Sequence, residues 1–227
     1  MIDGALHLSP SLLSADYGAL RDQALAATDA GGDSIHIDIM DGHYVHNLSF
    51  GLDLIPALKP HVRVPVVAHL EIAHPDSWIN EVAEAGADMI VVQEDTCPNL
   101  PYTVSAIRKT GVAAGVGINP DGTFRRIEAH PHILAEIDLL IVMGVYPGFG
   151  GQLFAATTVS NILKAARLRE ETNTHFAIAV DGGVNAATVP DIVAAGARYL
   201  IAGSSVFSGD IATNMERLRA AARGEPD

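Results

Sequence analysis

The chain reads AGGDSIHIDIMDG over residues 30–42, and this stretch carries the pattern that decides its fold. A glycine such as Gly31 suits the left-handed position at which a helix ends and the chain turns into a strand. The apolar run that follows is short enough for a buried strand. Similar Ala-Gly segments stand at residues 85–88 and 195–198, each directly before another apolar run. The pattern therefore predicts a helix, a glycine turn and a strand as a repeating unit.

Short apolar runs alternate with longer amphipathic segments along the chain. The runs stand at residues 5–8, 34–40, 64–70, 88–93, 112–118, 137–143, 175–181 and 199–203. Helix-like segments stand between them, such as 16–30, 76–85, 103–109, 157–171 and 186–195. Because strands alternating with helices form parallel βαβ units, we predict one α/β domain over residues 1–227, a (β/α)₈ TIM barrel. Residues 220–227 are expected to be a frayed tail. An open Rossmann sheet is disfavoured, since residues 9–14 read SPSLLS and lack its glycine motif.

Composition excludes several classes of protein. The 227 residues include 14 Lys and Arg against 27 Asp and Glu, so the formal net charge is −13. This balance disfavours binding to nucleic acid or an anionic membrane, both of which need a basic surface. Cys97 is the only cysteine, which excludes an intrachain disulfide and a thiolate zinc cluster. The chain shows neither a secretory signal nor a run of about 18 apolar residues, so we expect a cytoplasmic protein that spans no membrane.

Polar side chains stand at the predicted carboxyl ends of three strands. Strand side chains alternate between two faces, so His36 and Asp38 share the inward face, as do His69 and Glu71 on the next strand. Asp181 ends the seventh run with the same orientation. Active sites of barrels lie at this end, and buried charged groups there need a common partner. A single inward histidine is usually a satisfied core residue, but two histidines and two aspartates together favour a divalent ion such as zinc, iron or manganese.

Glycines gather in the predicted loops after the last three strands, at residues 148–151, 182–183 and 203–205. Glycines let backbone N–H groups approach an anion, and barrel phosphate sites are frequently built from the loops after strands seven and eight. A single glycine pair carries little information in a chain with 21 glycines. Three consecutive loops of this kind predict a phosphate site beside the polar strand ends.

Several segments resemble the ribulose-phosphate 3-epimerase family, in the family's order and across nearly the whole chain. The most specific are HIDIMDGH at residues 36–43 and PGFGGQ at 147–152, and further matches are SPSLLSAD at 9–16, HL at 69–70, VDGGVN at 180–185 and AGSSVF at 202–207. The resemblance implies a (β/α)₈ barrel of the ribulose-phosphate-binding type, and an isomerase of carbohydrate metabolism in the pentose phosphate pathway. By analogy of fold it also implies a homo-oligomer.

The resemblance further implies roles for individual residues. The family's metal ligands correspond to His36, Asp38, His69 and Asp181, and its acid/base pair corresponds to Asp38 and Asp181. Its substrate contacts correspond to Ser11, Met40, Met143, Gly150, Gly151, Gly182, Gly183, Gly203 and Ser204. One divalent ion per chain is expected, with Zn²⁺ as the first candidate and Fe²⁺, Mn²⁺ or Co²⁺ as alternatives.

These groups suit epimerisation at C3 of a ketose phosphate, first of all the interconversion of D-ribulose 5-phosphate and D-xylulose 5-phosphate. The reaction removes a proton from a carbon beside a carbonyl, which is too weak an acid for an unaided carboxylate. A metal at the C2 and C3 oxygens would stabilise the enediolate. One aspartate would take the proton from one face, and the other would return it on the opposite face.

Departures from the family pattern fall at four places near the predicted pocket, one of which includes two residues. Glu71 stands where the family usually has Met, and Gln93 where it usually has His. Gly144 and Tyr146 replace a hydroxyl residue and a smaller polar residue, while His46 interrupts a usual Val-Pro-Asn. Because buried polar groups discriminate hydroxyl patterns strongly, these changes predict an altered sugar specificity, with neutral drift as the alternative. Allulose 6-phosphate or a tetrulose phosphate then becomes a candidate substrate.

Two other functions stay open at this point. An aldolase- or decarboxylase-like lyase would need a lysine at a strand end, and it is disfavoured because Lys59, Lys109 and Lys164 fall in predicted helices. A non-catalytic phosphosugar-binding barrel would bind its ligand without metal-dependent proton exchange. The complete His/Asp set argues against this second alternative, but Glu71 keeps it open.

Overall fold

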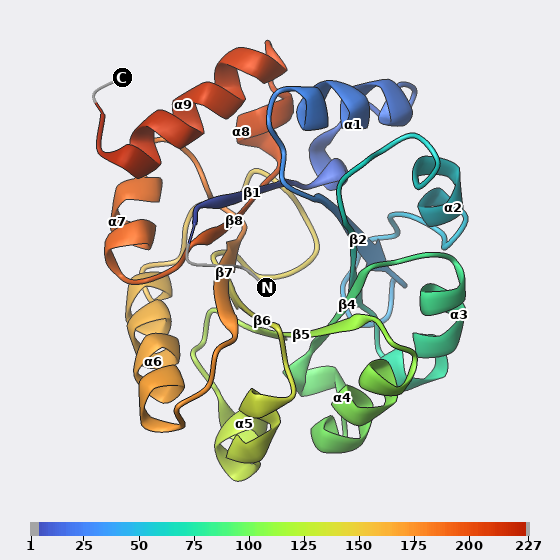
Figure 1. Ribbon diagram of the computed structural model, residues 1–227, viewed down its shortest axis with the longest axis vertical. Helices are drawn as coiled ribbons and strands as arrows, with labels where there is room; N and C mark the ends of the chain where they lie inside the picture. The colour runs from blue at the N-terminus through green and yellow to red at the C-terminus, as the bar shows by residue number, and fades with distance from the viewer. Residues whose placement is uncertain (1–4, 226–227) are drawn as a thin grey trace.

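The computed structural model describes residues 5–225 and shows eight parallel strands ringed by helices (Figure 1). The strands are β1 His7–Pro10, β2 Ile35–Met40, β3 Val66–Glu71, β4 Met89–Gln93, β5 Ala113–Ile118, β6 Leu139–Met143, β7 Ala177–Asp181 and β8 Tyr199–Ala202. Hydrogen-bonded neighbours follow the order β1-β8-β7-β6-β5-β4-β3-β2, and each of the eight predicted runs overlaps one strand. The predicted single-domain (β/α)₈ TIM barrel is confirmed.

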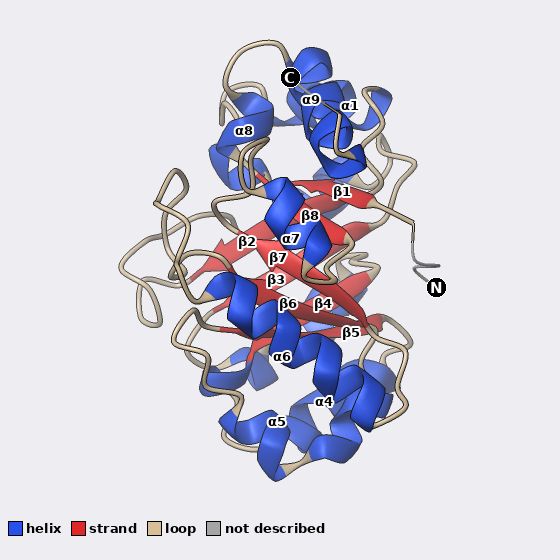
Figure 2. Cartoon of the chain, turned by 90° about the vertical axis from the view of Figure 1, so that its left-hand side faces the viewer, coloured by secondary structure: helices blue, strands red, loops and turns tan. Residues whose placement is uncertain are grey.

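Helices connect the strands and cover the outside of the barrel (Figure 2). They are α1 Leu20–Asp29, α2 Leu54–Leu58, α3 Ile79–Glu84, α4 Leu100–Lys109, α5 Arg125–Ala129, α6 Thr158–Glu171, α7 Val189–Ala194, α8 Ser204–Phe207 and α9 Ile211–Arg223, with 3₁₀ turns η1 Leu12–Ser14, η2 Pro75–Ser77, η3 Glu94–Thr96 and η4 Pro131–Ala135. The short α8 begins directly after Gly203, in the loop that follows β8.

The carboxyl-terminal helix is longer than expected. α9 packs against α1, α7 and α8, and it buries Ala221 in its last turn. Gly224 ends the helix in the left-handed conformation, with φ of 74°. The prediction of a frayed tail from residue 220 is therefore wrong for residues 220–223, because their apolar face finds a packing partner. Residues 226 and 227 lie outside the described part of the chain.

Alternation along the strands produces two apolar layers. Ile35, Ile37 and Ile39 of β2 point outward and are buried under the helices. A second cluster fills the inside of the barrel and consists of Val67, Val91, Leu139, Ile141, Met143, Ala179, Tyr199 and Ile201. Since His36 and Asp38 alternate with the outward isoleucines, they project into the barrel above this filling.

The barrel has one weak seam. β1 pairs with β8 along all four of its residues, starting with His7 opposite Tyr199. Toward β2 the described chain makes a single isolated bridge, between Ser11 and His36. The barrel is thus nearly closed, and the seam adjoins the strand that carries two of the predicted site residues.

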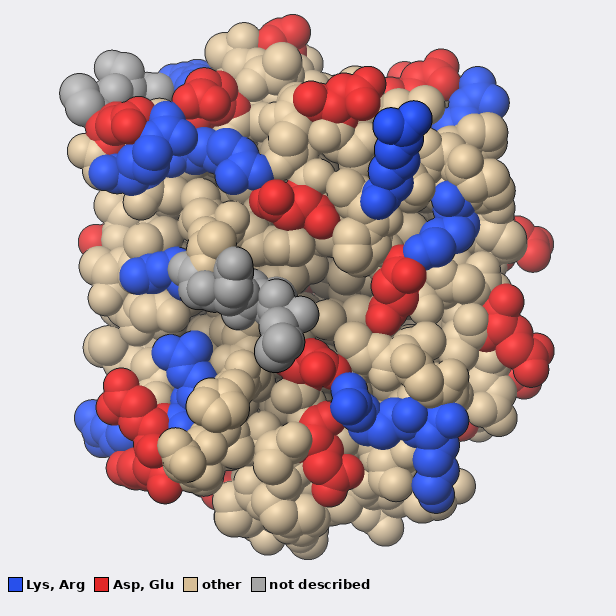
Figure 3. Space-filling model, in the orientation of Figure 1, with Lys and Arg blue, Asp and Glu red and all other residues tan. Residues whose placement is uncertain are grey.

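Charged side chains of both signs are interspersed over the face of the molecule shown in Figure 3. Three exposed or half-buried ion pairs illustrate this mixing: Lys59 with Asp88, Arg108 with Asp138, and Lys164 with Glu128. Within residues 5–225, no helix combines the length and the apolar character needed to cross a membrane.

Candidate active site

Four polar side chains converge where β2, β3 and β7 end. His36 and Asp38 come from β2, His69 from β3 and Asp181 from β7. One nitrogen or oxygen atom of each lies within 4.8 Å of the corresponding atoms of the others. All four residues are buried. The structure therefore brings together the complete set that the sequence predicted as metal ligands.

The two aspartates flank the histidine pair almost symmetrically. His36 Nε2 lies 3.1 Å from Asp38 Oδ1 and 3.3 Å from Asp181 Oδ2. His69 Nδ1 lies 3.3 Å and 3.4 Å from the same two oxygens. The two imidazole nitrogens are 3.2 Å apart. Two nitrogens and two oxygens thus point at a common centre.

The neighbouring carboxylates keep both histidines of this cluster protonated at neutral pH. Burial by itself lowers the pKa of both histidines, but the Asp38 and Asp181 carboxylates more than reverse the effect. The pKa of His36 rises to about 9 and that of His69 to about 10. Burial raises the pKa of Asp38, but the two imidazoles beside it hold that pKa far below its usual range. A divalent cation can replace the two imidazole protons, and its binding would then release them.

Neighbouring side chains orient two of these four groups. Ser11 Oγ donates a hydrogen bond of 2.6 Å to Asp38 Oδ2. The side-chain amide of Gln93 lies 2.9 Å from His69 Nε2, and the amide oxygen has no hydrogen-bond partner among the described residues. A half-turn of the amide lets this oxygen accept from His69 Nε2–H. With its proton on Nε2, a neutral His69 would present the lone pair of Nδ1 to the point at which the four side chains converge.

The donor set fits a divalent metal ion. Imidazole nitrogen and carboxylate oxygen are the ligands that zinc, iron and manganese accept. Asp38 Oδ1, which faces both histidines, has no hydrogen-bond partner among residues 5–225. Its contacts with the two imidazoles are ion pairs, and a cation that displaced their protons would coordinate this buried oxygen in their place.

A pocket opens above the cluster and holds the predicted substrate contacts. Asp38 and Asp181 form part of its lining. All nine predicted contacts also line it: Ser11, Met40, Met143, Gly150, Gly151, Gly182, Gly183, Gly203 and Ser204. The loops after β6, β7 and β8 therefore form one wall of the pocket, and the polar strand ends form its floor.

Backbone packing in this wall excludes side chains. Gly182 has φ of 91°, and a Cβ there would collide with the side chain of Val145. A Cβ at Gly203 would come within 2.6 Å of Ser14 Oγ. Glycine at these positions keeps the backbone amides accessible from the pocket.

Comparison with known proteins decides the family. The family model described as "Ribulose-phosphate 3 epimerase family" matches residues 7–207. The chain belongs to the ribulose-phosphate 3-epimerase family. It is 40% identical to the ribulose-phosphate 3-epimerase of Bacillus subtilis, over 89% of this chain and 92% of the relative. It is 37% identical to the enzyme of that name from Rhodobacter capsulatus, over 97% of both chains.

Solved structures agree on the fold. Orotidine 5′-phosphate decarboxylase from Pyrococcus horikoshii superimposes with a TM-score of 0.70 at 20% identity, over 96% of this chain and 99% of the other. A 3-hexulose-6-phosphate synthase superimposes with a TM-score of 0.64 at 20% identity, over 95% and 99%. At this identity the likeness concerns the barrel alone.

Only some of the departures from the usual ribulose-phosphate 3-epimerase pattern line the pocket. Glu71 and Tyr146 line the pocket; Glu71 is buried, whereas Tyr146 is largely exposed. Gln93 lies behind His69 and outside the pocket lining. His46 is exposed on the loop after β2 and does not line the pocket either. A Cβ at Gly144 would collide with the carbonyl oxygen of Gly182, so this departure follows from backbone packing.

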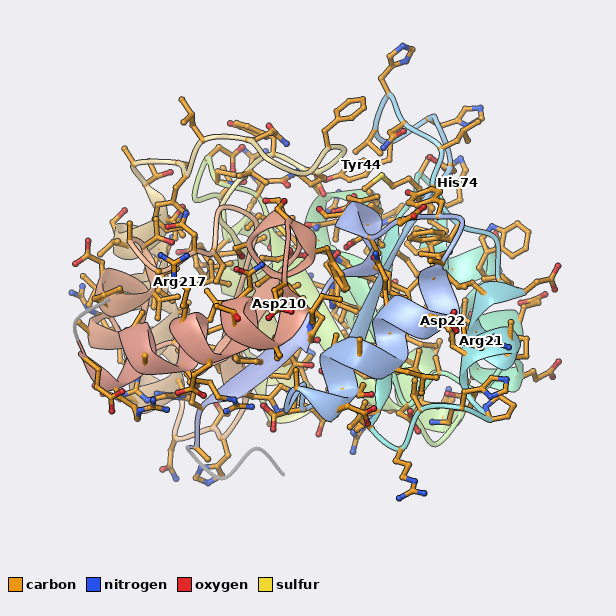
Figure 4. The ribbon with its side chains drawn as sticks, turned by 90° about the horizontal axis from the view of Figure 1, so that it is seen from above. Arg21, Asp22, Tyr44, His74, Asp210 and Arg217 are labelled. Atoms are coloured by element: carbon orange, nitrogen blue, oxygen red, sulfur yellow. The ribbon has the colours of Figure 1, made fainter. Side chains whose placement is uncertain are left out.

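The sequence did not predict the hydrogen bonds that connect the loop after β2 to other loops of the barrel. Tyr44 lies among the loops at one end of the barrel (Figure 4), and its hydroxyl donates to the Asp95 carboxylate at 3.1 Å and accepts from Asn119 Nδ2 at 3.0 Å. Asn47 Nδ2 donates to the Gly148 carbonyl at 2.7 Å. These contacts join loops that are far apart in sequence, so no local pattern predicted them.

Proposed function

We propose that this protein is a divalent-metal-dependent 3-epimerase that interconverts D-ribulose 5-phosphate and D-xylulose 5-phosphate. The observation that carries the proposal is the pair of buried carboxylates. Asp38 on β2 and Asp181 on β7 approach the same two imidazoles from different strands. An inversion at carbon needs two such groups, one on each face of the reacting centre.

His36, Asp38, His69 and Asp181 would hold the metal ion. When bound, it would supply Lewis acidity to the C2 carbonyl of the ketose, which makes the C3 proton removable. Gln93 and Ser11 support two of the ligands, so the donor atoms are positioned before a substrate enters. With the ion bound, His36 and His69 would be neutral, because each would donate a nitrogen lone pair to it.

The two aspartates would move the proton. One of them, ionised, takes the proton from C3 on its side of the sugar. The other, protonated, delivers a proton to the opposite face of the planar enediolate. Ser11 donates to Asp38 Oδ2 and thereby leaves Oδ1 as the unpartnered oxygen of that carboxylate. Met40 and Met143 line the same pocket and keep water away from the intermediate.

The glycine loops would bind the phosphate group. Gly150, Gly183 and Gly203 stand on the pocket wall beside the aspartates, where backbone amides can meet an anion without a side chain in between. Binding energy from this remote group holds C3 between the two carboxylates. The proposal thus assigns metal binding and proton transfer to the floor of the pocket and phosphate binding to its wall.

Deuterium exchange at C3 tests the proposal. The metal-loaded protein is incubated with D-ribulose 5-phosphate in deuterated water, and the C3 proton is followed by NMR. Loss of that signal together with appearance of D-xylulose 5-phosphate, both stopped by a chelator, is the expected result. A folded, metal-containing sample that exchanges no proton would overturn the assignment of this substrate.

A different ketose phosphate is the second candidate, and Glu71 is the observation that favours it. Its buried carboxyl lines the pocket in place of the usual methionine. Allulose 6-phosphate and a tetrulose phosphate are therefore the next substrates to test in the same exchange assay. If they also fail, a non-catalytic phosphosugar-binding barrel gains weight. A homo-oligomeric state and a cytoplasmic location stay predictions from the sequence.

A further inference from the structure

Glu71 is a buried carboxyl group for which the described residues provide a long ion pair with His69 but no hydrogen bond. Only 2% of the residue is exposed, and its Oε2 has no hydrogen-bond partner among the described residues. Its Oε1 lies 3.9 Å from His69 Nδ1, too far for a hydrogen bond. Buried polar groups in native structures nearly always find a partner, so a carboxyl left without one points to a ligand.

The carboxyl belongs to the pocket and not to the metal-ligand set. The four converging atoms come from His36, Asp38, His69 and Asp181. In the pairing of β2 with β3, Asp38 stands opposite His69, and Met40 stands opposite Glu71. Glu71 and Met40 are thus two residues further along their strands, nearer the pocket, and both line it. A substrate lying on the ligand cluster would meet Glu71 from the side.

The order of the strands around the barrel indicates which end of the substrate would face Glu71. The glycine loops follow β6, β7 and β8, whereas Glu71 ends β3, which is four strands from β7 in either direction around the barrel. With the phosphate in the glycine loops and C3 between the aspartates, the opposite end of the sugar points toward β3. In a 2-ketose 5-phosphate that end is the C1 hydroxymethyl group.

We propose that Glu71 binds the C1 hydroxyl of the substrate and makes the enzyme selective for ketose phosphates that carry this group. The inference rests on the proposed epimerase function and specifies its substrate class. A hydroxyl can both donate and accept, so it satisfies the carboxyl whether that group is ionised or protonated. A substrate without this hydroxyl leaves the buried Glu71 without a partner, which is the situation that yields strong discrimination.

A substrate pair that differs only at C1 tests the proposal. D-xylulose 5-phosphate and 1-deoxy-D-xylulose 5-phosphate share the carbonyl, the configuration at C3 and the phosphate. Deuterium exchange at C3 gives kcat/KM for each. We expect wild-type protein to prefer the hydroxylated compound by about 100-fold or more. In Glu71→Met that preference falls below about tenfold, and in Glu71→Gln, which keeps hydrogen-bonding atoms, it stays near the wild-type value.

The ratio of the two substrates separates this role from general damage to the protein. Any intrinsic difference in reactivity between the compounds is the same in every variant and cancels. Glu84→Met makes the same chemical change on the exposed face of α3 and should leave the ratio unchanged. An equal ratio in wild type and Glu71→Met would overturn the proposal, even if both proteins are active.

Binding measurements keep the proposal testable without turnover. If wild-type protein exchanges neither compound, the proposed epimerisation fails for these substrates. Calorimetric titration with the same two phosphates still compares their Kd values in wild type, Glu71→Met and Glu71→Gln. A preference for the hydroxylated compound that only Glu71→Met loses supports the Glu71 contact, and equal Kd ratios in all three reject it.

Discussion

Both ends of the barrel interior contain buried polar side chains. Only at the amino end do these side chains all have hydrogen-bond partners among the described residues. At the amino end, the Ser34 hydroxyl lies 2.7 Å from both Ser9 Oγ and Tyr199 Oη and 2.9 Å from His7 Nε2. The His7 ring also stacks on Tyr199 at 4.0 Å. None of these side chains is among the buried polar atoms without a partner in the described chain.

The carboxyl end shows the opposite condition. Four of the five buried side-chain atoms that lack a partner within residues 5–225 lie here, on His36, Asp38, Glu71 and Gln93. Burial also raises the pKa of the Glu71 carboxyl to about 8, despite the nearby His69. The contrast is between polar side chains that hydrogen-bond to one another and polar side chains that the two proposals assign to metal and substrate. Removing a polar group at the carboxyl end should therefore affect turnover or metal binding. Removing one at the amino end should affect the free energy of unfolding.

The largest expected effect is loss of turnover at the carboxyl end. Asp38→Asn or Asp181→Asn removes one of the two groups proposed to transfer the proton and should lower kcat by about 10²–10⁴-fold. The C3 exchange assay measures the loss, and circular dichroism checks that the fold remains. Full activity in either variant would exclude the two-carboxylate mechanism.

Metal binding should depend steeply on pH. The histidine pKa values of about 9 and 10 mean that both imidazoles must lose protons as an ion binds. Apparent zinc affinity should therefore rise with pH, by up to about 100-fold per unit between pH 6 and 8. Titration against a competing chelator measures it. An affinity that does not change over this range would contradict the predicted proton release.

The stability of the metal-free protein should change with pH in the opposite direction. Both histidine pKa values lie above the unfolded value of 6.5, so the folded state holds these protons more tightly. The resulting stabilisation is complete below about pH 6.5 and is lost as pH rises through 9 to 10. Thermal unfolding of stripped and zinc-loaded protein at pH 6.5, 8 and 9.5 checks this, and only the stripped protein should lose Tm by this mechanism.

A smaller effect is expected for Gln93, which contacts the proposed metal ligand His69 and does not line the pocket. Gln93→Leu removes the amide beside His69 Nε2 and should weaken metal binding by about 10–100-fold. The ratio of rates for D-xylulose 5-phosphate and its 1-deoxy analogue should stay at the wild-type value in metal-saturated protein. A changed ratio with unchanged metal affinity would instead place Gln93 among the specificity residues.

The smallest expected effect on activity is at the amino end of the barrel. Ser34→Ala removes the hydroxyl shared by His7, Ser9 and Tyr199, so the free energy of unfolding should fall by about 1–3 kcal/mol. Denaturant titration measures this loss, while kcat should be unchanged. A large loss of kcat in a folded variant would mean that the two ends are coupled.

Much of this architecture was predictable because its causes are local. Strand alternation alone placed His36 and Asp38 inside the barrel, and the glycine turns separated its units. The unpartnered state of Glu71 was not predictable, since it depends on the register between β2 and β3 and on what surrounds the carboxyl. The helix-like pattern at residues 76–85 likewise did not show which face of that segment is covered, and Trp78 within it is 47% exposed.

The seam between β1 and β2 has a consequence for synthesis of the chain on the ribosome. β1 is made before the other seven strands, yet its main partner, β8, is made after all of them, and β2 offers it one bridge. At about 5–20 residues per second, the first strand waits on the order of 10 to 40 seconds before it can be paired on both sides. Asp181 likewise emerges long after His36, so the complete set of proposed metal ligands exists only once β7 has emerged. Limited proteolysis of stalled chains would show β1 protected only after β8 has emerged.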